Sequence, residues 1–461
     1  MPIMHKLNPY MDQKIDQLTQ ALIKIPKFGN GIGLHRMQYL CQKILASEWF
    51  AQSNPIHVVG SNGKGSVTVI LSALLRALGI RTGQYTSPHL FDFSERIVVD
   101  GQAIANSALE NYYQHFLDKE AAYKLNAPED HFGAFEAFTF IALTHFQAQA
   151  CEAMVLEAGI GGRYDSTRVA QGSHVAFTSI DLEHSKLLGH SLELIAFDKL
   201  DIAKEGATVV LGEITDKALL QRIKNYAQLK NIKLLCVAEH CQIKNIVIHA
   251  EEMHLSFSMD GLEFNHLCSK LIGKHQASNI MVAILLLKNW LNIYYPAITA
   301  EQFVHAVQNT LPRIQWPGRF QKISTAPNIF IDVGHSPAAI YAIIDLIKKA
   351  DSGDWLVVLG ISPDKDIATM ARPFLELASS IFCTQSYHRA GSSADIFNIL
   401  QAHNERKIEI SNIPKLESAI DMAILQAKRM NKSILIVGGL FLAIEAYAYL
   451  QGRSPESLHF F

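Results

Sequence analysis

The chain has 461 residues, of which 49% are hydrophobic and 18% are charged, a composition typical of globular proteins. The formal net charge of −2 excludes the strongly basic balance expected of a general nucleic-acid binder, and the composition excludes extended disorder. A chain of this length predicts two or three domains, each with its own core.

Residues 1–13 lack the apolar core of a signal peptide, and the longest apolar stretches, such as residues 434–444, are too short to span a membrane. We therefore expect a cytoplasmic protein without a membrane partner. The six cysteines include no C-x-x-C pair, which favours buried thiols over a zinc site or a disulfide framework. These cysteines are Cys41, Cys151, Cys236, Cys241, Cys268 and Cys383.

A strand, a glycine-rich loop and a helix follow one another early in the chain. Residues 56–59 form a run typical of a buried strand, and residues 67–78 have the pattern of a helix. Glycines in the loop let the backbone approach an anion, the helix start directs N–H groups at it, and Lys64 adds a positive charge. The strict pattern has glycine at 58 and a hydroxyl at 65, so we interpret this loop as a variant phosphate-binding loop rather than a plain turn. Its members are Gly60, Ser61, Asn62, Gly63, Lys64, Gly65 and Ser66, the last a candidate Mg²⁺ ligand.

Polar side chains follow three further predicted strands. The strand at 81–85 is followed by Ser87, the strand at 153–156 ends at Glu157, and the strand at 174–180 is followed by His184. In open α/β sheets, ligands bind beyond the carboxyl ends of the strands. A hydroxyl, a carboxylate and an imidazole at one sheet edge favour a metal site over a merely structural histidine.

Two nearby segments have less specific patterns. Residues 91–99 alternate toward a turn at Asp100-Gly101 and predict an ordinary hairpin. Residues 132–149 predict a buried helix with Glu136 near its start. Because a buried carboxylate needs a partner, Glu136 either caps this helix or belongs to the site.

The α/β alternation continues with a helix at 192–203, which carries Lys199, and with elements at 208–211, 216–229 and 233–237. Residues 241–267 then predict a small antiparallel sheet. A long helix at 274–291 either fills the core or presents His275 and Asn279 to a nucleotide. Beyond a linker at 294–297, four more strands predict a second sheet, at 329–333, 356–359, 380–383 and 433–437.

These motifs together resemble the folylpolyglutamate synthase and dihydrofolate synthase family, within the Mur ligase superfamily of ATP-dependent amide-forming ligases. The resemblance runs from about Tyr39 to about Tyr449. In the first half it rests on GSNGKGS, TSPHL followed by SER, Phe135-Glu136, EAGIGGRYDST, DLEH and GKHQASN. In the second half it rests on WPGRFQ, DVGHSP, DKD and Arg389-Ala390.

The resemblance implies an α/β fold of two domains. Residues 1–297 would form a phosphate-loop, Mur-ligase-like domain with a mostly parallel sheet and a small antiparallel sheet. Residues 298–461 would form a Rossmann-like domain. It also implies a monomer that binds small molecules, and no coiled-coil heptads argue otherwise.

The resemblance also assigns roles to individual residues. Lys64 would hold the ATP phosphates, Ser66 a first Mg²⁺, and Ser87, Glu157 and His184 a second Mg²⁺. Lys199 corresponds to a lysine that the family carbamylates, so that it acts as an extra carboxylate near the metals. The remaining roles are implied for Asn279 with adenine, Arg319 with the γ-phosphate across a cleft, Asp332 with ribose, Phe135 and Asp165 with the pterin, and His335 with glutamate.

The implied activity is ATP-dependent joining of L-glutamate to dihydropteroate, to a reduced folate, or to both, through an acyl phosphate. Several residues depart from the family pattern, mostly on the acid and amine sides: Asp92, Arg168, the carboxylates around Lys199, Ser336 and Gly439. Two alternatives therefore stay open. One is a related ligase with another acid and amine, and the other is a paralogue that binds ATP without catalysis.

Overall fold

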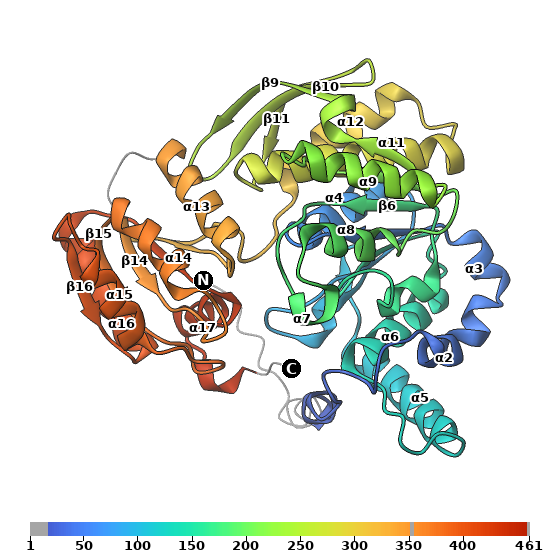
Figure 1. Cartoon of the computed structure of the whole chain (residues 1–461), viewed down its shortest axis with the longest axis horizontal. Helices are drawn as coiled ribbons and strands as arrows, with labels where there is room; N and C mark the ends of the chain where they lie inside the picture. Colours follow the sequence, from blue (N-terminus) through green and yellow to red (C-terminus); the bar gives the residue numbers. More distant parts are fainter. Residues whose placement is uncertain (1–16, 351–354, 459–461) are drawn as a thin grey trace. The chain divides into compact units, whose positions relative to one another are not determined.

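The computed structural model describes residues 17–350 and 355–458, which form two compact units (Figure 1). Among the described residues, the first unit contains 17–240 and Asn279–Val307, and the second contains Cys241–Ser278 and Gln308–Leu458. The division at residue 297 stays a prediction. Within the described ranges, no helix is both long and apolar enough to cross a bilayer.

The first unit is built on an eight-stranded sheet with the order β4-β3-β2-β5-β1-β6-β7-β8. The run from β2 to β8 is parallel, and β3 and β4 are added antiparallel at one edge. Strands β1, β5, β6 and β7 are buried throughout, as expected for parallel strands covered on both faces. The strands are β1 Pro55–Val59, β2 Thr82–Tyr85, β3 Ile97–Val99, β4 Gln102–Ala103, β5 Ala153–Glu157, β6 His174–Phe177, β7 Thr208–Leu211 and β8 Lys233–Cys236.

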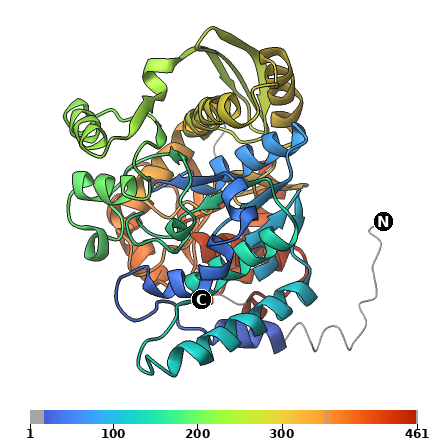
Figure 2. The same ribbon diagram turned by 90° about the vertical axis from the view of Figure 1, so that its right-hand side faces the viewer.

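Helices surround this sheet and form two apolar clusters with it. One cluster joins α2, α5 and α6 to β2 and β5, and the other joins α8 and α9 to β6 and β7. Helices α5 and α6 lie side by side in both ribbon views (Figures 1 and 2). The helices are α2 His35–Leu45, α3 Glu48–Gln52, α4 Lys64–Ala77, α5 Asn106–Lys124, α6 Ala134–Ala148, α7 Ser185–Leu188, α8 Leu192–Leu200, α9 Lys217–Leu229, α10 Val237–His240, α11 Lys274–Tyr294 and α12 Ala300–Thr310.

The second unit contains a three-stranded antiparallel sheet, drawn in yellow-green in Figure 1, and a six-stranded sheet. The larger sheet has the order β12-β13-β17-β14-β15-β16 and is parallel except for β12. Its strands are β12 Gln321–Thr325, β13 Asn328–Ile331, β14 Trp355–Leu359, β15 Ala378–Cys383, β16 Glu409–Asn412 and β17 Ile434–Val437. The small sheet has β9 Cys241–Ile248, β10 Met253–Met259 and β11 Leu262–Ser269, and the helices are α13 Pro337–Ala350, α14 Ile367–Ala371, α15 Ser393–Ala402, α16 Leu416–Met430 and α17 Leu440–Leu450.

Most predicted elements are confirmed, but several details are wrong. Helix α4 begins at Lys64 rather than at 67, because Gly63 takes a left-handed conformation that lets the helix start directly after it. The hairpin with its turn at Asp100-Gly101 is confirmed, since β3 pairs antiparallel with β4, but its first strand is shorter than expected because Phe93–Arg96 form a 3₁₀ helix. Strand β6 ends at Phe177, not at 180, because the next two residues bind the phosphate loop through their side chains.

Two further expectations need correction. Four cysteines are buried as predicted, but Cys241 and Cys268 are half-buried because they lie on the small antiparallel sheet. The edge strands β12 and β16 were not predicted, since their short, polar sequences carry no clear alternation.

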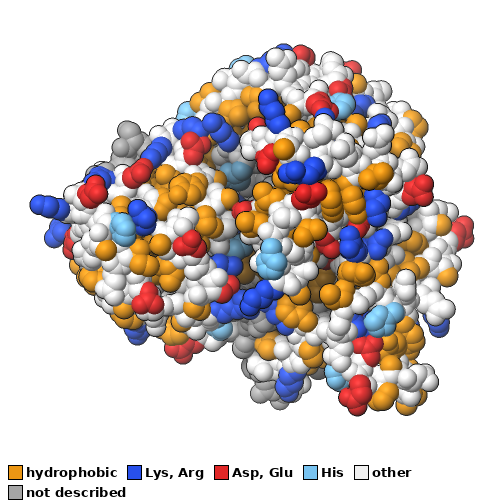
Figure 3. Space-filling view, viewed as in Figure 1, with side chains coloured by type: hydrophobic (Ala, Val, Ile, Leu, Met, Phe, Trp, Pro, Cys, Tyr) orange, Lys and Arg blue, Asp and Glu red, His pale blue; other side chains and the backbone are white. Residues whose placement is uncertain are grey.

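On the face drawn in Figure 3, side chains of both charges are interspersed over each unit, in keeping with the small net charge.

Candidate active site

The phosphate loop joins β1 to α4, and two of its glycines are required by the backbone. Gly60 has φ +142°, and a Cβ there would lie 1.9 Å from the Thr178 hydroxyl oxygen. Gly63 has φ +86°, and a Cβ there would lie 2.5 Å from Oδ1 of Asn279. Neither position accepts another side chain. Asn279, the predicted adenine contact, thus packs directly against this loop within the first unit.

The end of β6 holds the loop in place. The backbone N–H of Asn62 donates to the Ser179 hydroxyl at 2.9 Å, and the hydroxyl of Thr178 donates back to the Asn62 carbonyl at 2.5 Å. The Lys64 ammonium folds over the loop and donates to the Gly60 carbonyl at 2.8 Å. A fixed loop with a lysine at its rim is the arrangement that binds phosphate groups.

Lys199 is fully buried beneath the same loop. Its Nζ donates to the Gly60 carbonyl at 3.0 Å and to Oε1 of Glu183 at 2.6 Å. Burial, together with the neighbouring charge of Lys64, lowers the pKa of Lys199 to about 8. Although burial alone would raise it, the pKa of Glu183 is lowered because Lys64 and Lys199 stabilise the carboxylate. Sequence reasoning missed Glu183, although it lies inside the DLEH motif next to His184.

The carboxylates that surround Lys199 in the sequence point elsewhere. Asp198 accepts the N–H of Gly162 at 2.9 Å. Asp201 accepts hydrogen bonds from Arg163 at 2.7 Å and from Tyr226 at 2.8 Å. These departures from the family pattern hold the glycine-rich loop and the neighbouring helix, and neither aspartate pairs with the Lys199 amine by hydrogen bond.

The candidate metal ligands Ser87 and Glu157 meet where the neighbouring strands β2 and β5 end. The N–H of Ser87 donates to Oε2 of Glu157 at 3.2 Å, and Glu157 is buried. Ser66 is buried in the first turn of α4. His184 takes a left-handed conformation at the start of α7, directly after Glu183. The structure thus confirms that Ser87 and Glu157 lie together at this sheet edge.

Phe135 and Asp165 both contact the second glycine-rich loop. A Cβ on Gly159 would lie 2.9 Å from the Phe135 ring, and this ring packs on Tyr85 with 5.6 Å between centroids. Asp165 accepts the N–H of Gly159 at 2.8 Å and the hydroxyl of Thr167 at 2.6 Å. Its carboxylate therefore shapes the loop, and burial raises its pKa.

Glu136 caps its helix and also forms a buried ion pair. It accepts the N–H of Gly133 at 2.8 Å, which confirms the capping alternative. Glu136 also accepts a hydrogen bond from Nε–H of Arg36, with 2.9 Å between Nε and Oε1, and both side chains are buried. Sequence reasoning missed Arg36, because the partners are 100 residues apart in the chain.

We expect Glu136→Ala to lower the free energy of unfolding by about 2 kcal/mol, because the start of α6 loses its cap at Gly133 and the buried Arg36 keeps only one of its two carboxylate partners, Asp130. Urea denaturation at neutral pH measures this loss. Glu110→Ala, on the exposed surface of α5, is the control and should change stability by less than about 0.5 kcal/mol. Equal stability of the two variants would contradict a structural role for the pair.

In the second unit, Asp332 hydrogen-bonds to the loops that carry the WPGRFQ and DVGHSP motifs. Its carboxylate accepts the N–H of Gly334 at 2.6 Å and the N–H of Phe320 at 2.8 Å. Burial raises its pKa, although the neighbouring Arg319 opposes this. Arg319 follows Gly318, whose φ of +71° makes the turn. His335 lies within hydrogen-bond distance of the Val333 carbonyl, with Nδ1 at 3.2 Å from the oxygen.

Comparison with known proteins matches both halves of the chain to one class. Residues 58–287 match the Mur ligase middle domain, and residues 318–440 match the Mur ligase, glutamate ligase domain. Together with a glycine loop at the start of α4 and a second α/β unit, these matches define an ATP-dependent ligase of the Mur type.

Individual relatives indicate which family of Mur-type ligases the chain belongs to. The chain is 30% identical to a folylpolyglutamate synthase of Lacticaseibacillus casei, over 72% of this chain and 76% of the relative. It is 28% identical to a dihydrofolate synthase/folylpolyglutamate synthase of Bacillus subtilis, over 90% of this chain and 94% of the relative. The protein belongs to the folylpolyglutamate synthase/dihydrofolate synthase family.

Solved structures have the same fold. A folylpolyglutamate synthase of Mycobacterium tuberculosis, complexed with ADP and AMPPCP, has a TM-score of 0.85 at 23% identity and covers 96% of this chain and 99% of its own. A folylpolyglutamate synthase complexed with AMPPCP and folate has a TM-score of 0.81 at 25% identity, covering 95% of this chain and 99% of its own.

Proposed function

We propose that this protein joins L-glutamate to dihydropteroate, to a reduced folate, or to both, with hydrolysis of ATP to ADP and phosphate. The observation that carries the proposal is the phosphate loop, held by side chains at the end of β6, with Lys64 above it and the pair of buried Lys199 and half-buried Glu183 below it. Support for the substrates comes from relatives named for both activities and from a neighbour solved with AMPPCP and folate.

A carboxylate is a poor electrophile, so the acid substrate first takes the γ-phosphoryl group of ATP and becomes an acyl phosphate. The amine of glutamate then attacks the acyl carbon, the amide bond forms, and inorganic phosphate leaves with the bonding electrons. Lys64 and the loop N–H groups would offset the negative charge that spreads over the transferring phosphoryl group.

The donor set at the sheet edge fits Mg²⁺. Hydroxyls at Ser66 and Ser87 and the buried carboxylate of Glu157 are hard oxygen ligands, to which His184 adds an imidazole. We propose one ion at Ser66 and a second at Ser87, Glu157 and His184. When bound, Mg²⁺ would stabilise charge on the phosphates. The chain's part is to hold Ser87 and Glu157 at the ends of β2 and β5, Ser66 in the first turn of α4 and His184 at the start of α7.

The remaining assignments are proposals that rest on the family resemblance. Asn279, Arg319 and Asp332 would contact the nucleotide, and His335 the incoming glutamate. Phe135 and Asp165 would define the pterin side. We further propose that the protein acts as a cytoplasmic monomer on small-molecule substrates.

Three of the family departures, Asp92, Ser336 and Arg168, make local structural contacts. Asp92 caps the 3₁₀ helix at Phe93, accepting the N–H of Ser94 at 2.8 Å. Ser336 accepts the N–H of Ala339 at 3.3 Å at the start of α13. Arg168 donates to the Arg163 carbonyl at 2.8 Å. Gly439 has extended backbone, and a Cβ there would lie 3.9 Å from the Ser362 hydroxyl oxygen, an ordinary contact, so nothing in the structure explains a glycine at this position.

The direct test is phosphate release from Mg-ATP with L-glutamate and either dihydropteroate or tetrahydrofolate, each omitted in turn. We expect release that requires both glutamate and a pterin, without any need for Asp92→Arg. Release only with other acids and amines would replace the proposed substrates. No release with any acceptor, despite Mg-ATP binding, would identify a silent ATP-binding paralogue.

A further inference from the structure

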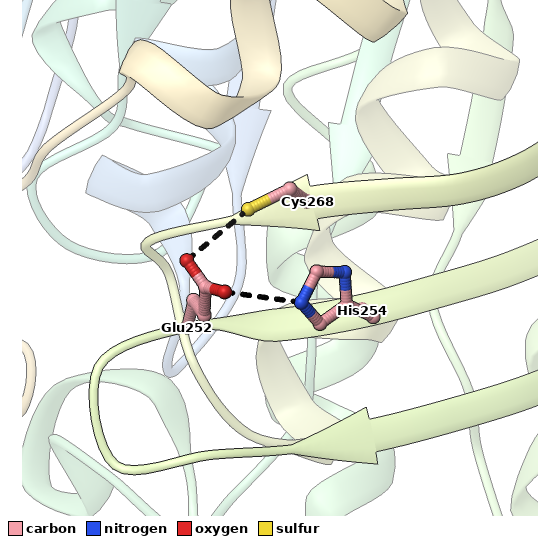
Figure 4. A group of neighbouring side chains, drawn as sticks. All are labelled: Glu252, His254 and Cys268. Atoms are coloured by element: carbon pink, nitrogen blue, oxygen red, sulfur yellow. Dashed lines mark hydrogen bonds and ion pairs between the residues drawn. The ribbon is translucent and has the colours of Figure 1, made fainter.

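Three side chains with metal-binding atoms cluster at one end of the small antiparallel sheet, within the second unit (Figure 4). They are the carboxylate of Glu252, the imidazole of His254 and the thiol of Cys268, all half-buried. One ligand atom from each lies within 4.8 Å of the other two. None of these residues takes part in the proposed ligase chemistry.

The strand register brings the three side chains together. His254 on β10 lies directly opposite Cys268 on β11, so both side chains project from the same face. Glu252 lies two residues before His254, in the turn that leads from β9 into β10. Because the paired strands fix His254 and Cys268, a metal would have to order only the carboxylate.

Two distances in the cluster are close to the edges of a tetrahedral ion site, each measured to a different oxygen of Glu252, only one of which would bind the ion. Nε2 of His254 lies 3.1 Å from Oε1 of Glu252, and Sγ of Cys268 lies 3.6 Å from Oε2 of Glu252. Bond lengths of about 2.3 Å to sulfur and about 2.0–2.2 Å to nitrogen and oxygen give tetrahedral edges of about 3.4 Å and about 3.6 Å for the same pairs. Small side-chain movements would therefore complete the geometry.

We propose that Glu252, His254 and Cys268 form a binding site for a thiophilic divalent cation, with Zn²⁺ as the best fit. Thiolate and imidazole together select Zn²⁺ over Mg²⁺ or Ca²⁺, which prefer oxygen. The fourth position would be taken by water or by His249, whose ring centroid is 5.8 Å from that of His254. On binding, the Cys268 thiol loses its proton to solvent and the sulfur lone pair bonds the metal.

Lys270 is the competitor that the metal must displace. Its ammonium lies 3.0 Å from Oε2 of Glu252, the oxygen that also accepts the thiol. Lys270 is exposed, so its ammonium can return to water when the cation binds. A bound ion would tie the β9–β10 turn to β11 and stabilise this sheet, a structural role separate from catalysis.

Cobalt titration of the full-length protein, after chelator treatment and removal of the chelator, tests the site. We expect a thiolate-to-Co²⁺ charge-transfer band in the near ultraviolet, lost on addition of Zn²⁺. Cys268→Ser should abolish the band, whereas Cys241→Ser, the other half-buried cysteine of the sheet, should keep it. His254→Ala should weaken Co²⁺ binding by more than about tenfold. Loss of a residue that only hydrogen-bonds a metal ligand typically costs at least about tenfold in affinity, and loss of a ligand itself should cost more.

A second measurement uses only the unmodified sequence and so does not depend on variant folding. The rate at which iodoacetamide alkylates each cysteine is measured by peptide mass spectrometry. Zn²⁺ should slow the alkylation of Cys268 and leave the alkylation rate of Cys241 unchanged. A thiolate band that persists in Cys268→Ser, no band in the original chain, or equal alkylation of Cys268 with and without Zn²⁺ would each overturn the site.

Discussion

Lys64→Ala is expected to reduce ATP-dependent amide formation by at least about a thousandfold while leaving the fold intact. Removing one preorganised group that stabilises transition-state charge typically reduces kcat by 10²–10³-fold, and Lys64 is the full positive charge on the phosphate loop. The fold should survive because the half-buried Lys64 side chain donates hydrogen bonds only to two carbonyls of its own loop, Gly60 at 2.8 Å and Ser61 at 3.3 Å.

The assay is phosphate release under saturating acid, amine and Mg-ATP, combined with circular dichroism and thermal unfolding. Lys217→Ala is the matched control, because this lysine is equally a helix-start cation, at α9, but is exposed and remote from the loop in sequence. We expect Lys217→Ala to keep normal turnover. Near-normal turnover of Lys64→Ala would contradict the proposal that this loop binds the phosphates of ATP.

Several parts of this arrangement could be predicted from sequence because parallel strands end at a common edge. Ser87 and Glu157 come from strands that are neighbours in the sheet, so their meeting follows from the fold class alone. The phosphate loop is similarly local, since seven consecutive residues carry its chemistry.

Partners that are distant in sequence could not be predicted in this way. The Arg36–Glu136 pair joins residues 100 positions apart, and no periodic pattern links a charge in one helix to a charge in another. Glu183 was passed over because its motif suggested the adjacent His184, whereas its ion pair with Lys199 depends on how α8 packs beneath the loop. The cluster at Glu252, His254 and Cys268 likewise depends on strand register, which cysteine spacing does not reveal.

Lys199→Ala is expected to reduce turnover by at least about a hundredfold and to regain activity when a short carboxylic acid, such as acetate or propionate, is added. We propose, from the family resemblance, that Lys199 is carbamylated; the carbamate would form when the neutral amine attacks carbon dioxide and releases a proton. With its pKa at about 8, about a tenth of this amine is neutral at pH 7, compared with less than about one in a thousand for an ordinary lysine.

The position of the amine decides where a carbamate would act. Nζ lies 3.0 Å from the Gly60 carbonyl at the base of the phosphate loop, so a carboxylate built on it would add negative charge at that loop. In Lys199→Ala, a small acid can occupy the vacated space and supply the same charge. Lys199→Arg fills that space with a permanent cation and should be neither active nor rescued.

The pH dependence separates a carbamate from a simple ion pair between Lys199 and Glu183. Because the pKa of Lys199 is lowered, its amine becomes neutral as pH rises through about 8. Reactivation of carbon-dioxide-depleted enzyme, measured at a fixed concentration of dissolved carbon dioxide, should accelerate over the same interval. A ¹³C signal from labelled carbon dioxide, present in the original chain and absent in Lys199→Arg, would identify the carbamate directly. If Lys199→Arg is instead active without rescue, the positive charge beside Glu183 is what the site needs, and the lysine acts as an unmodified partner of that carboxylate.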